Sequence, residues 1–235
     1  MSKKYDNTSE YSGAGRGMRL VFTAALMQII SAVLGVIATV VAACSGVMFL
    51  ADASDTTGSV FAISVILGIL CFIAQIVAYI LNLVGLGKAR NSEIYLQSAF
   101  MISIFGLVCI VVAAILSCIP GVPSMASSIG TTIGDICEIL IVICVCTGCA
   151  NLLDKLGDEK LVKKAAITSN LFAITFAISV FVNLLSTWVF GSEAQVITIV
   201  ILAIVSVILQ VIAYIFYITF LKKASKDFLA EARVD

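Results

Sequence analysis

Histidine is absent from the 235 residues of this chain. Its absence removes the commonest general base and the commonest metal ligand of proteins. This argues against an intramembrane metalloprotease, a serine–histidine protease of the rhomboid type and a haem held by histidine. We therefore expect a protein that is not an enzyme and that binds neither a metal nor a cofactor.

Charged residues are also scarce. They make up 12% of the chain, and hydrophobic residues make up 61%. A soluble domain carries about 25% charged and about 45–50% apolar residues. Because a soluble fold cannot hide this much apolar side chain, we expect the lipid bilayer to be the main partner and expect no nucleic acid.

Six apolar runs are long enough to cross a bilayer, whose hydrocarbon core of roughly 30 Å takes about 20 helical residues. They lie approximately at residues 20–50, 60–86, 99–119, 131–153, 165–189 and 196–221. In hydrocarbon, runs of this length satisfy their backbone hydrogen bonds only as helices. The sequence therefore predicts an all-α integral membrane protein with six transmembrane helices, built within residues 19–221.

The basic residues predict the orientation of these helices. All 14 lysines and arginines lie before the first run, between the second and third, between the fourth and fifth, or after the sixth. If each run crosses the membrane once, all of them lie on one side. The positive-inside rule then places both termini in the cytoplasm, and we expect the bacterial plasma membrane as the location.

Two polar segments flank the predicted membrane domain. We expect residues 1–18 to be a disordered cytoplasmic tail, in which Gly13, Gly15 and Gly17 form a flexible linker. Residues 222–235 form a cytoplasmic C-terminal tail. Its apolar residues suit an amphipathic helix on the inner leaflet, and its charges suit a solvated helix end; the sequence leaves both open.

One pattern occurs twice, in residues 75–89 and 210–224. Each copy has a glutamine, a tyrosine four residues later and a lysine where the apolar run stops. Residues around Asn151 and Lys155 resemble the end of this pattern more weakly. The copies favour three tandem helical hairpins related by an axis along the membrane normal.

Polar side chains near the predicted bilayer midplane are the first candidate site. The glutamine of each copy lies roughly 16 Å inside the end of its run, at 1.5 Å per residue. The candidate residues are Gln28, Gln75, Tyr79, Asn82, Gln210, Tyr214 and Tyr217. They line a solute path or form a seam between helices, in which amide hydrogen bonds contribute about 0.6–2 kcal/mol each; we favour the seam.

An acidic pair, Asp135 and Glu138, is the second candidate. Their spacing puts both carboxylates on one face near the predicted start of the fourth helix, at the outer surface. They form an external cation site or interact favourably with the helix N-terminus, with Thr131 or Thr132 as the cap. We favour the interaction with the helix terminus.

Cysteines form the third candidate. Cys118 and Cys137 lie near the outer surface across a short loop, where an oxidising medium favours a disulfide. Cys144, Cys146 and Cys149 include a C-x-x-C motif. At about 100° per residue, Cys146 and Cys149 project away from Cys144, which argues against a site built from four thiolates.

The sequence does not identify an activity. Short loops and the lack of catalytic groups favour a non-enzymatic membrane scaffold or a subunit of a complex, whose partners are other membrane subunits or further copies of the chain. The alternative is a transporter, permease subunit or channel for a neutral or weakly polar solute. The repeated pattern and the glutamines at the midplane support this alternative.

Overall fold

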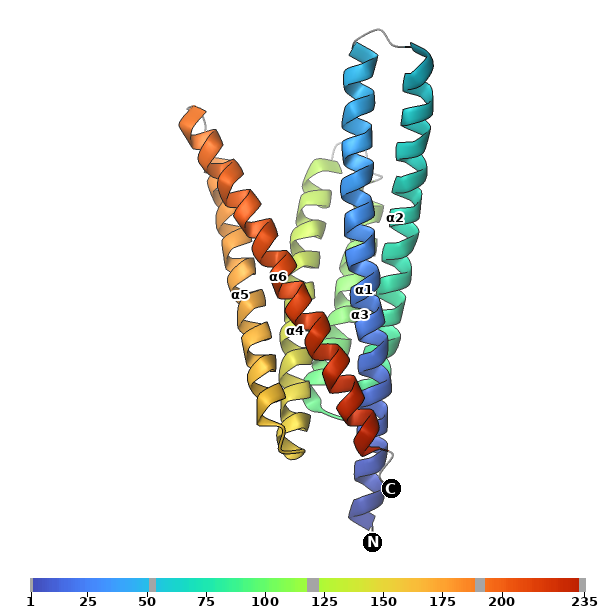
Figure 1. Cartoon of the computed structure of the whole chain (residues 1–235), viewed down its shortest axis with the longest axis vertical. Helices are drawn as coiled ribbons and strands as arrows, with labels where there is room; N and C mark the ends of the chain where they lie inside the picture. Colours follow the sequence, from blue (N-terminus) through green and yellow to red (C-terminus); the bar gives the residue numbers. More distant parts are fainter. Residues whose placement is uncertain (1, 51–53, 118–122, 189–192, 233–235) are drawn as a thin grey trace. The chain divides into compact units, whose positions relative to one another are not determined.

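The computed structural model describes residues 2–50, 54–117, 123–188 and 193–232 (Figure 1). In these ranges nearly every residue is helical and no strand occurs. The helices are α1 (Ser2–Leu50), α2 (Ser54–Ala89), α3 (Ile94–Ser117), α4 (Pro123–Lys155), α5 (Glu159–Trp188) and α6 (Glu193–Glu231). Each of these six is long and apolar enough to cross a membrane. The prediction of an all-helical chain with six helices of this kind is confirmed, and they fit a multi-pass membrane protein.

Each helix begins several residues before its apolar run. An apolar run marks only the part of a helix that suits hydrocarbon. The residues on either side of it continue the same helix, because the hydrogen bonds within a helix do not depend on apolar side chains. The largest differences are at the two ends of the chain, where α1 begins at Ser2 and α6 continues to Glu231.

The chain forms two compact units, and each is described by itself. The first unit comprises Met1–Arg19 and Gly85–Asp235, and the second comprises Leu20–Val84. In the first unit, α3 packs against α4, α4 against α5, and α5 against α6.

In the second unit, a reciprocal polar pair joins α1 to α2. The Ser31 hydroxyl donates to the Cys71 carbonyl oxygen at 3.1 Å, and the Cys71 thiol donates to the Ser31 carbonyl oxygen at 3.2 Å. Ser31 is fully buried. These bonds hold two apolar helices together at a point where hydrocarbon offers no competing hydrogen-bond partner.

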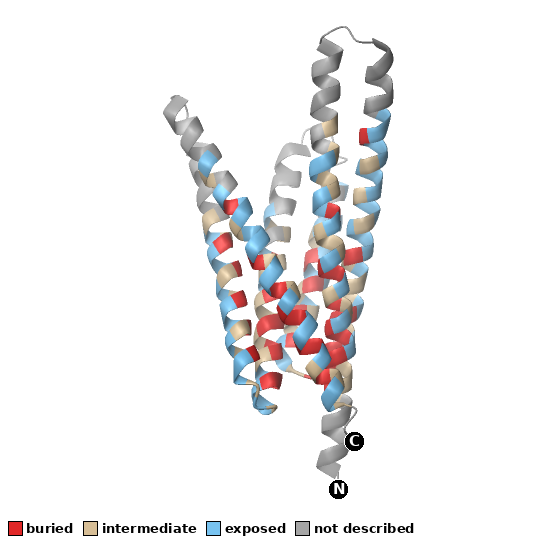
Figure 2. Cartoon of the chain, viewed as in Figure 1, coloured by how far each residue is buried: buried red, intermediate tan, exposed pale blue. Residues whose placement is uncertain are grey.

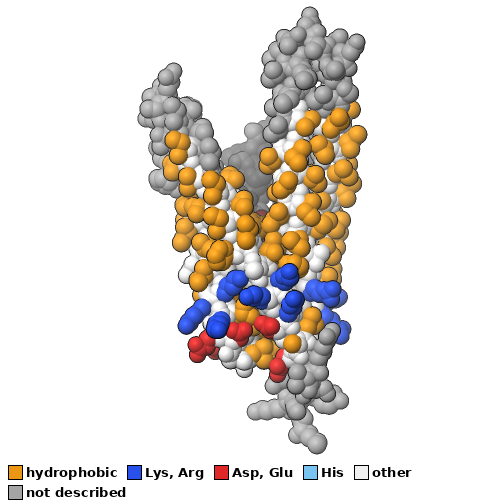
Figure 3. Space-filling model, viewed as in Figure 1, with side chains coloured by type: hydrophobic (Ala, Val, Ile, Leu, Met, Phe, Trp, Pro, Cys, Tyr) orange, Lys and Arg blue, Asp and Glu red, His pale blue; other side chains and the backbone are white. Residues whose placement is uncertain are grey.

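The first unit has a charged end, formed by residues 10–19, 85–93, 151–164 and 222–231. Figure 3 shows the described lysines and arginines as a belt that borders the hydrophobic surface, with acidic side chains beyond it. Figure 2 shows that the buried residues of this unit gather toward the same end. The largest fully buried side chains include Met18, Leu86, Leu96, Phe220 and Phe228.

The N-terminal segment differs from its prediction. The structure has helix here instead of a disordered tail, and Tyr11, Ala14 and Met18 are buried. The glycines interpreted as a linker lie at close helix contacts. A Cβ added at Gly17 would lie 2.5 Å from the Gly85 carbonyl oxygen, and one at Gly15 would lie 2.8 Å from Cγ of Leu229. Small residues let helix backbones approach this closely.

The C-terminal segment is helical, as both readings of the sequence have it, but its surroundings differ from both. It continues α6, and its Phe228 ring is fully buried and stacks on Tyr11, with ring centroids 6.2 Å apart. The N-terminal segment therefore covers the apolar face that we expected either lipid or water to meet.

Candidate functional site in the apolar helices

A carboxyl group and a tyrosine hydroxyl meet between α4 and α6. Tyr214 donates a hydrogen bond to Oε1 of Glu138. Both side chains are partly buried. The two residues belonged to separate candidate sites in the sequence, the acidic pair and the second glutamine–tyrosine pattern, and the fold brings them together.

This contact lies within the apolar part of both helices, away from the charged end of the unit. Lys222 of the basic belt follows Tyr214 by eight residues, which is about 12 Å along a helix. Glu138, which touches Tyr214, precedes Lys155 by 17 residues, or about 25 Å along α4. The side chain of Asp135 lies outside the described residues.

The N-terminus of α4 does not stabilise the carboxylate of Glu138. We expected α4 to start near Thr131, but it starts at Pro123. Glu138 therefore lies about four turns into the helix, and the stabilising effect of a helix terminus on a carboxylate falls off within the first turn. The preferred interpretation of the acidic pair is wrong for Glu138, whose described partner is a tyrosine of α6.

Aromatic side chains surround the tyrosine end of this contact. Phe172 of α5 meets Tyr214 at 5.2 Å and Tyr217 at 5.6 Å between ring centroids, in both cases edge to face. Phe172 and Tyr217 are each 4% exposed. The three rings fix the position of the Tyr214 hydroxyl, and Glu138 places a group there that can hold a proton or a cation. An ionisable group inside the membrane is costly and marks a functional site by default.

The remaining polar residues of the first candidate site differ in how far they are exposed. Gln75 and Gln210 are exposed, whereas Gln28, Tyr79 and Asn82 are partly buried. The sequence singled out the glutamines as the polar contact between helices. The structure instead has the Ser31–Cys71 pair in the second unit and the Glu138–Tyr214 pair in the first.

The cysteines of α4 occupy two environments. Cys146 and Cys149 are fully buried, as small apolar side chains often are. Cys137 lies against Gly106 of α3 and lines an apolar groove of about 580 Å³ between α3 and α4, together with Met101, Ile102, Phe105, Ile133, Ile136 and Leu140. Cys118 lies outside the described residues, so its disulfide with Cys137 stays a prediction.

The charged end holds a polar network that the sequence analysis missed. Asn151 donates to Glu93 at 3.0 Å, and Lys155 forms an ion pair with Glu10 at 3.1 Å. Ser92 donates to the backbone carbonyl oxygen of Glu10 at 2.7 Å. These residues are far apart in the chain and follow no spacing rule, so the sequence carried no signal for the network.

Comparison with known protein families, curated proteins and solved structures finds no match to this chain. Its function therefore has to be argued from its own residues.

Proposed function

We propose that this chain is a non-enzymatic membrane scaffold or complex subunit, which assembles in the bilayer with other membrane helices, including those of further copies of itself. The observation that carries the proposal is the exposure of Gln75 and Gln210. Each side chain lies on an apolar helix roughly 16 Å from the end of its run.

An amide exposed at that depth has no partner in hydrocarbon. Each glutamine is followed by an exposed apolar residue, Ile76 in α2 and Val211 in α6. A polar group that faces hydrocarbon without a hydrogen bond is costly. An amide that bonds to another transmembrane helix instead stabilises the pair of helices by about 0.6–2 kcal/mol. Helix association therefore satisfies both glutamines.

The test is cross-linking in native membranes. A photoreactive amino acid at Val211, beside Gln210, should give a defined adduct with a second membrane chain. Gln210→Leu combined with Gln75→Leu should lower the yield of this adduct at least about fivefold. The thermal stability of the purified protein should change little, because the amides are exposed within the chain.

Ile212→Leu is the matched control, since it alters a neighbouring exposed side chain of α6 without touching an amide. It should leave the adduct unchanged. An adduct that persists in the double glutamine variant, or the absence of any adduct in native membranes, contradicts the proposal.

We also propose three tandem hairpins with both termini in the cytoplasm of a bacterial cell. The two copies of the repeated pattern support the repeat, because they match in burial as well as in sequence. Ala78 and Ala213 are buried, as are Leu86 and Leu221, while both glutamines are exposed. The gathering of basic residues at one end of the first unit supports the orientation (Figure 3). Labelling of single cysteines from either side of the membrane tests it.

The Glu138–Tyr214 contact favours a second candidate, a transporter, permease subunit or channel for a neutral or weakly polar solute. Ionisable groups inside membranes commonly mark such paths. Proteoliposomes that contain the protein should then swell in a panel of neutral solutes, and Glu138→Leu should abolish the swelling. Equal swelling of empty liposomes contradicts this candidate.

A further inference from the structure

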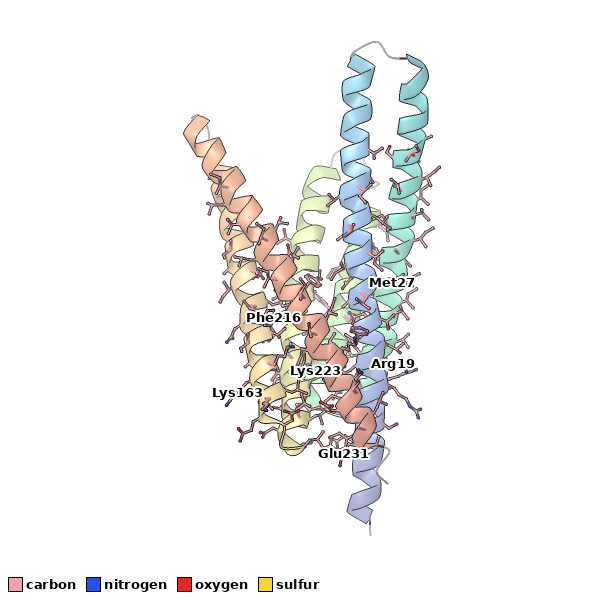
Figure 4. The ribbon with its side chains drawn as sticks, viewed as in Figure 1. Arg19, Met27, Lys163, Phe216, Lys223 and Glu231 are labelled. Atoms are coloured by element: carbon pink, nitrogen blue, oxygen red, sulfur yellow. The ribbon has the colours of Figure 1, made fainter. Side chains whose placement is uncertain are left out.

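The apolar parts of the helices lack basic residues. Lysine and arginine are absent from residues 20–87, 91–154 and 165–221, and the chain has no histidine. Figure 4 shows Phe216, which follows Tyr214 by two residues, farther along α6 from the charged end than Lys223. The positive charges of the chain therefore lie at the borders of its apolar parts and not beside the carboxyl group of Glu138.

The titratable groups on the helices near Glu138 are phenols and thiols, besides one further carboxyl group. Tyr214 of α6 donates its hydroxyl hydrogen to Oε1 of Glu138. The other phenol and thiol residues in the apolar parts of α3, α4 and α6 are Cys109, Cys137, Cys144, Cys146, Cys149 and Tyr217, and residues 165–188 of α5 contain none. None of these groups carries a positive charge in either protonation state. The further carboxyl group is that of Asp135, three residues before Glu138, whose side chain lies outside the described residues.

A carboxylate in such surroundings needs a neutralising partner. An ionised group inside a hydrocarbon layer is costly, and a carboxyl group removed from water takes up a proton instead of keeping its charge. A metal cation that binds oxygen needs several ligand atoms. Among the described residues, no three histidine, cysteine, aspartate or glutamate side chains come together in a way that could hold one. A proton needs a single carboxylate oxygen, and it is therefore the partner that these residues fit.

The hydrogen bond from Tyr214 decides which oxygen of Glu138 holds the proton. Because Oε1 accepts the Tyr214 hydrogen, it has the role of the carbonyl oxygen, and the acid proton belongs on Oε2. The ring of Phe172, which is 4% exposed, lies 5.2 Å from that of Tyr214 and limits its movement. Glu138 itself is partly exposed, so its proton can exchange with the surroundings.

We propose that Glu138 is a proton-binding site within the membrane. Its carboxyl group carries an exchangeable proton on Oε2 while Oε1 accepts the hydrogen bond from Tyr214. Uptake of the proton forms one O–H bond and removes one negative charge, and release to water reverses both changes. The site requires neither the assembly nor the solute path proposed above.

The experiment is infrared spectroscopy of the full chain in lipid at neutral pH. A protonated carboxylic acid has a carbonyl stretching band that an ionised carboxylate lacks. An ordinary glutamate, with a pKa of about 4.3, is ionised under these conditions. The wild type should show the carboxylic acid band, and the band should move to lower frequency in heavy water because the proton exchanges for deuterium.

Glu138→Gln is the test variant and should abolish the band. Its matched control, Asp135→Asn, removes a carboxyl group one helical turn away on the same helix and should leave the band unchanged. Tyr214→Phe should keep the band and move it to higher frequency, because the carbonyl oxygen of Glu138 loses its hydrogen bond. Tyr95→Phe, at an exposed site, should leave its frequency unchanged.

The wild type decides the proposal even if Glu138→Gln does not fold. Absence of the band at neutral pH would overturn it, and so would a band that does not move in heavy water. Persistence of the band in Glu138→Gln, or its loss in Asp135→Asn, would place the proton elsewhere and overturn the assignment. A loss of the band in sodium chloride, but not in choline chloride at equal concentration, would mean that the site binds a metal cation instead.

Discussion

Residues 75–89 of α2 and residues 210–224 of α6 share a sequence pattern and a pattern of burial, but their partners differ. The α2 copy ends on small residues, and Gly85 and Ala89 approach Gly17 of α1 at backbone distance. The α6 copy instead packs large rings, and its Tyr214 bonds to Glu138. Matching helices can thus be held by close backbone contact in one place and by an aromatic and carboxyl cluster in another.

The largest effect is expected from filling the small-residue contact. Gly17→Leu should destabilise the fold by about 3 kcal/mol or more, because even a Cβ at this position would meet Gly85 and Ala89 at less than 3 Å. The measurement is the midpoint of thermal unfolding in detergent, together with the yield of monodisperse protein.

Gly68→Leu is the control for this variant, because a Cβ added at Gly68 has nothing within 4 Å. It should leave the midpoint nearly unchanged. Equal losses from the two substitutions would show that the contact of Gly17 has no special importance.

Disruption of the aromatic cluster of Phe172, Tyr214 and Tyr217 should cause the second largest loss of stability. Phe172→Ala removes the ring that touches both Tyr214 and Tyr217, and should cost about 3 kcal/mol. Ile174→Ala on the same helix should cost less than about 1 kcal/mol, because Ile174 is 54% exposed. Thermal unfolding of both variants under the same conditions decides the point, and a smaller loss for Phe172 than for Ile174 would refute the cluster.

Removal of the hydrogen bond between Tyr214 and Glu138 should cause a moderate loss of stability. A double-mutant cycle of Tyr214→Phe and Glu138→Gln should give a coupling energy of about 1 kcal/mol. The cycle is read from thermal unfolding, with Tyr95→Phe at an exposed site as the reference. Additive effects of the two substitutions would mean that the two groups do not stabilise each other.

The smallest effect is expected where α1 meets α2 within the second unit. Ser31→Ala removes the hydroxyl that donates to Cys71 and should cost about 0.6 kcal/mol. Ser98→Ala is the control, since among the described residues the Ser98 hydroxyl bonds to the backbone of its own helix, at Ile94. A hydrogen–deuterium exchange experiment should show faster exchange near Cys71 in the first variant alone.

The sequence by itself determined the helical class and the six apolar helices. Length and hydrophobicity are sufficient for this, because hydrocarbon leaves a long apolar run no other way to satisfy its backbone. The sequence also supplied most members of the polar cluster, since Glu138, Tyr214 and Tyr217 are conspicuous in apolar surroundings.

Only the tertiary structure decided which of these residues meet. Gly15 and Gly17 have the composition of a flexible linker, and their role at close contacts depends on Leu229 and Gly85, which are distant in the chain. Glu138 contacts Tyr214 because α4 and α6 both pack against α5. The spacing of residues within one helix does not predict such a contact. Hydrophobicity sets which segments are helices, whereas the pairing of their faces depends on the shapes and the few polar groups of several helices at once.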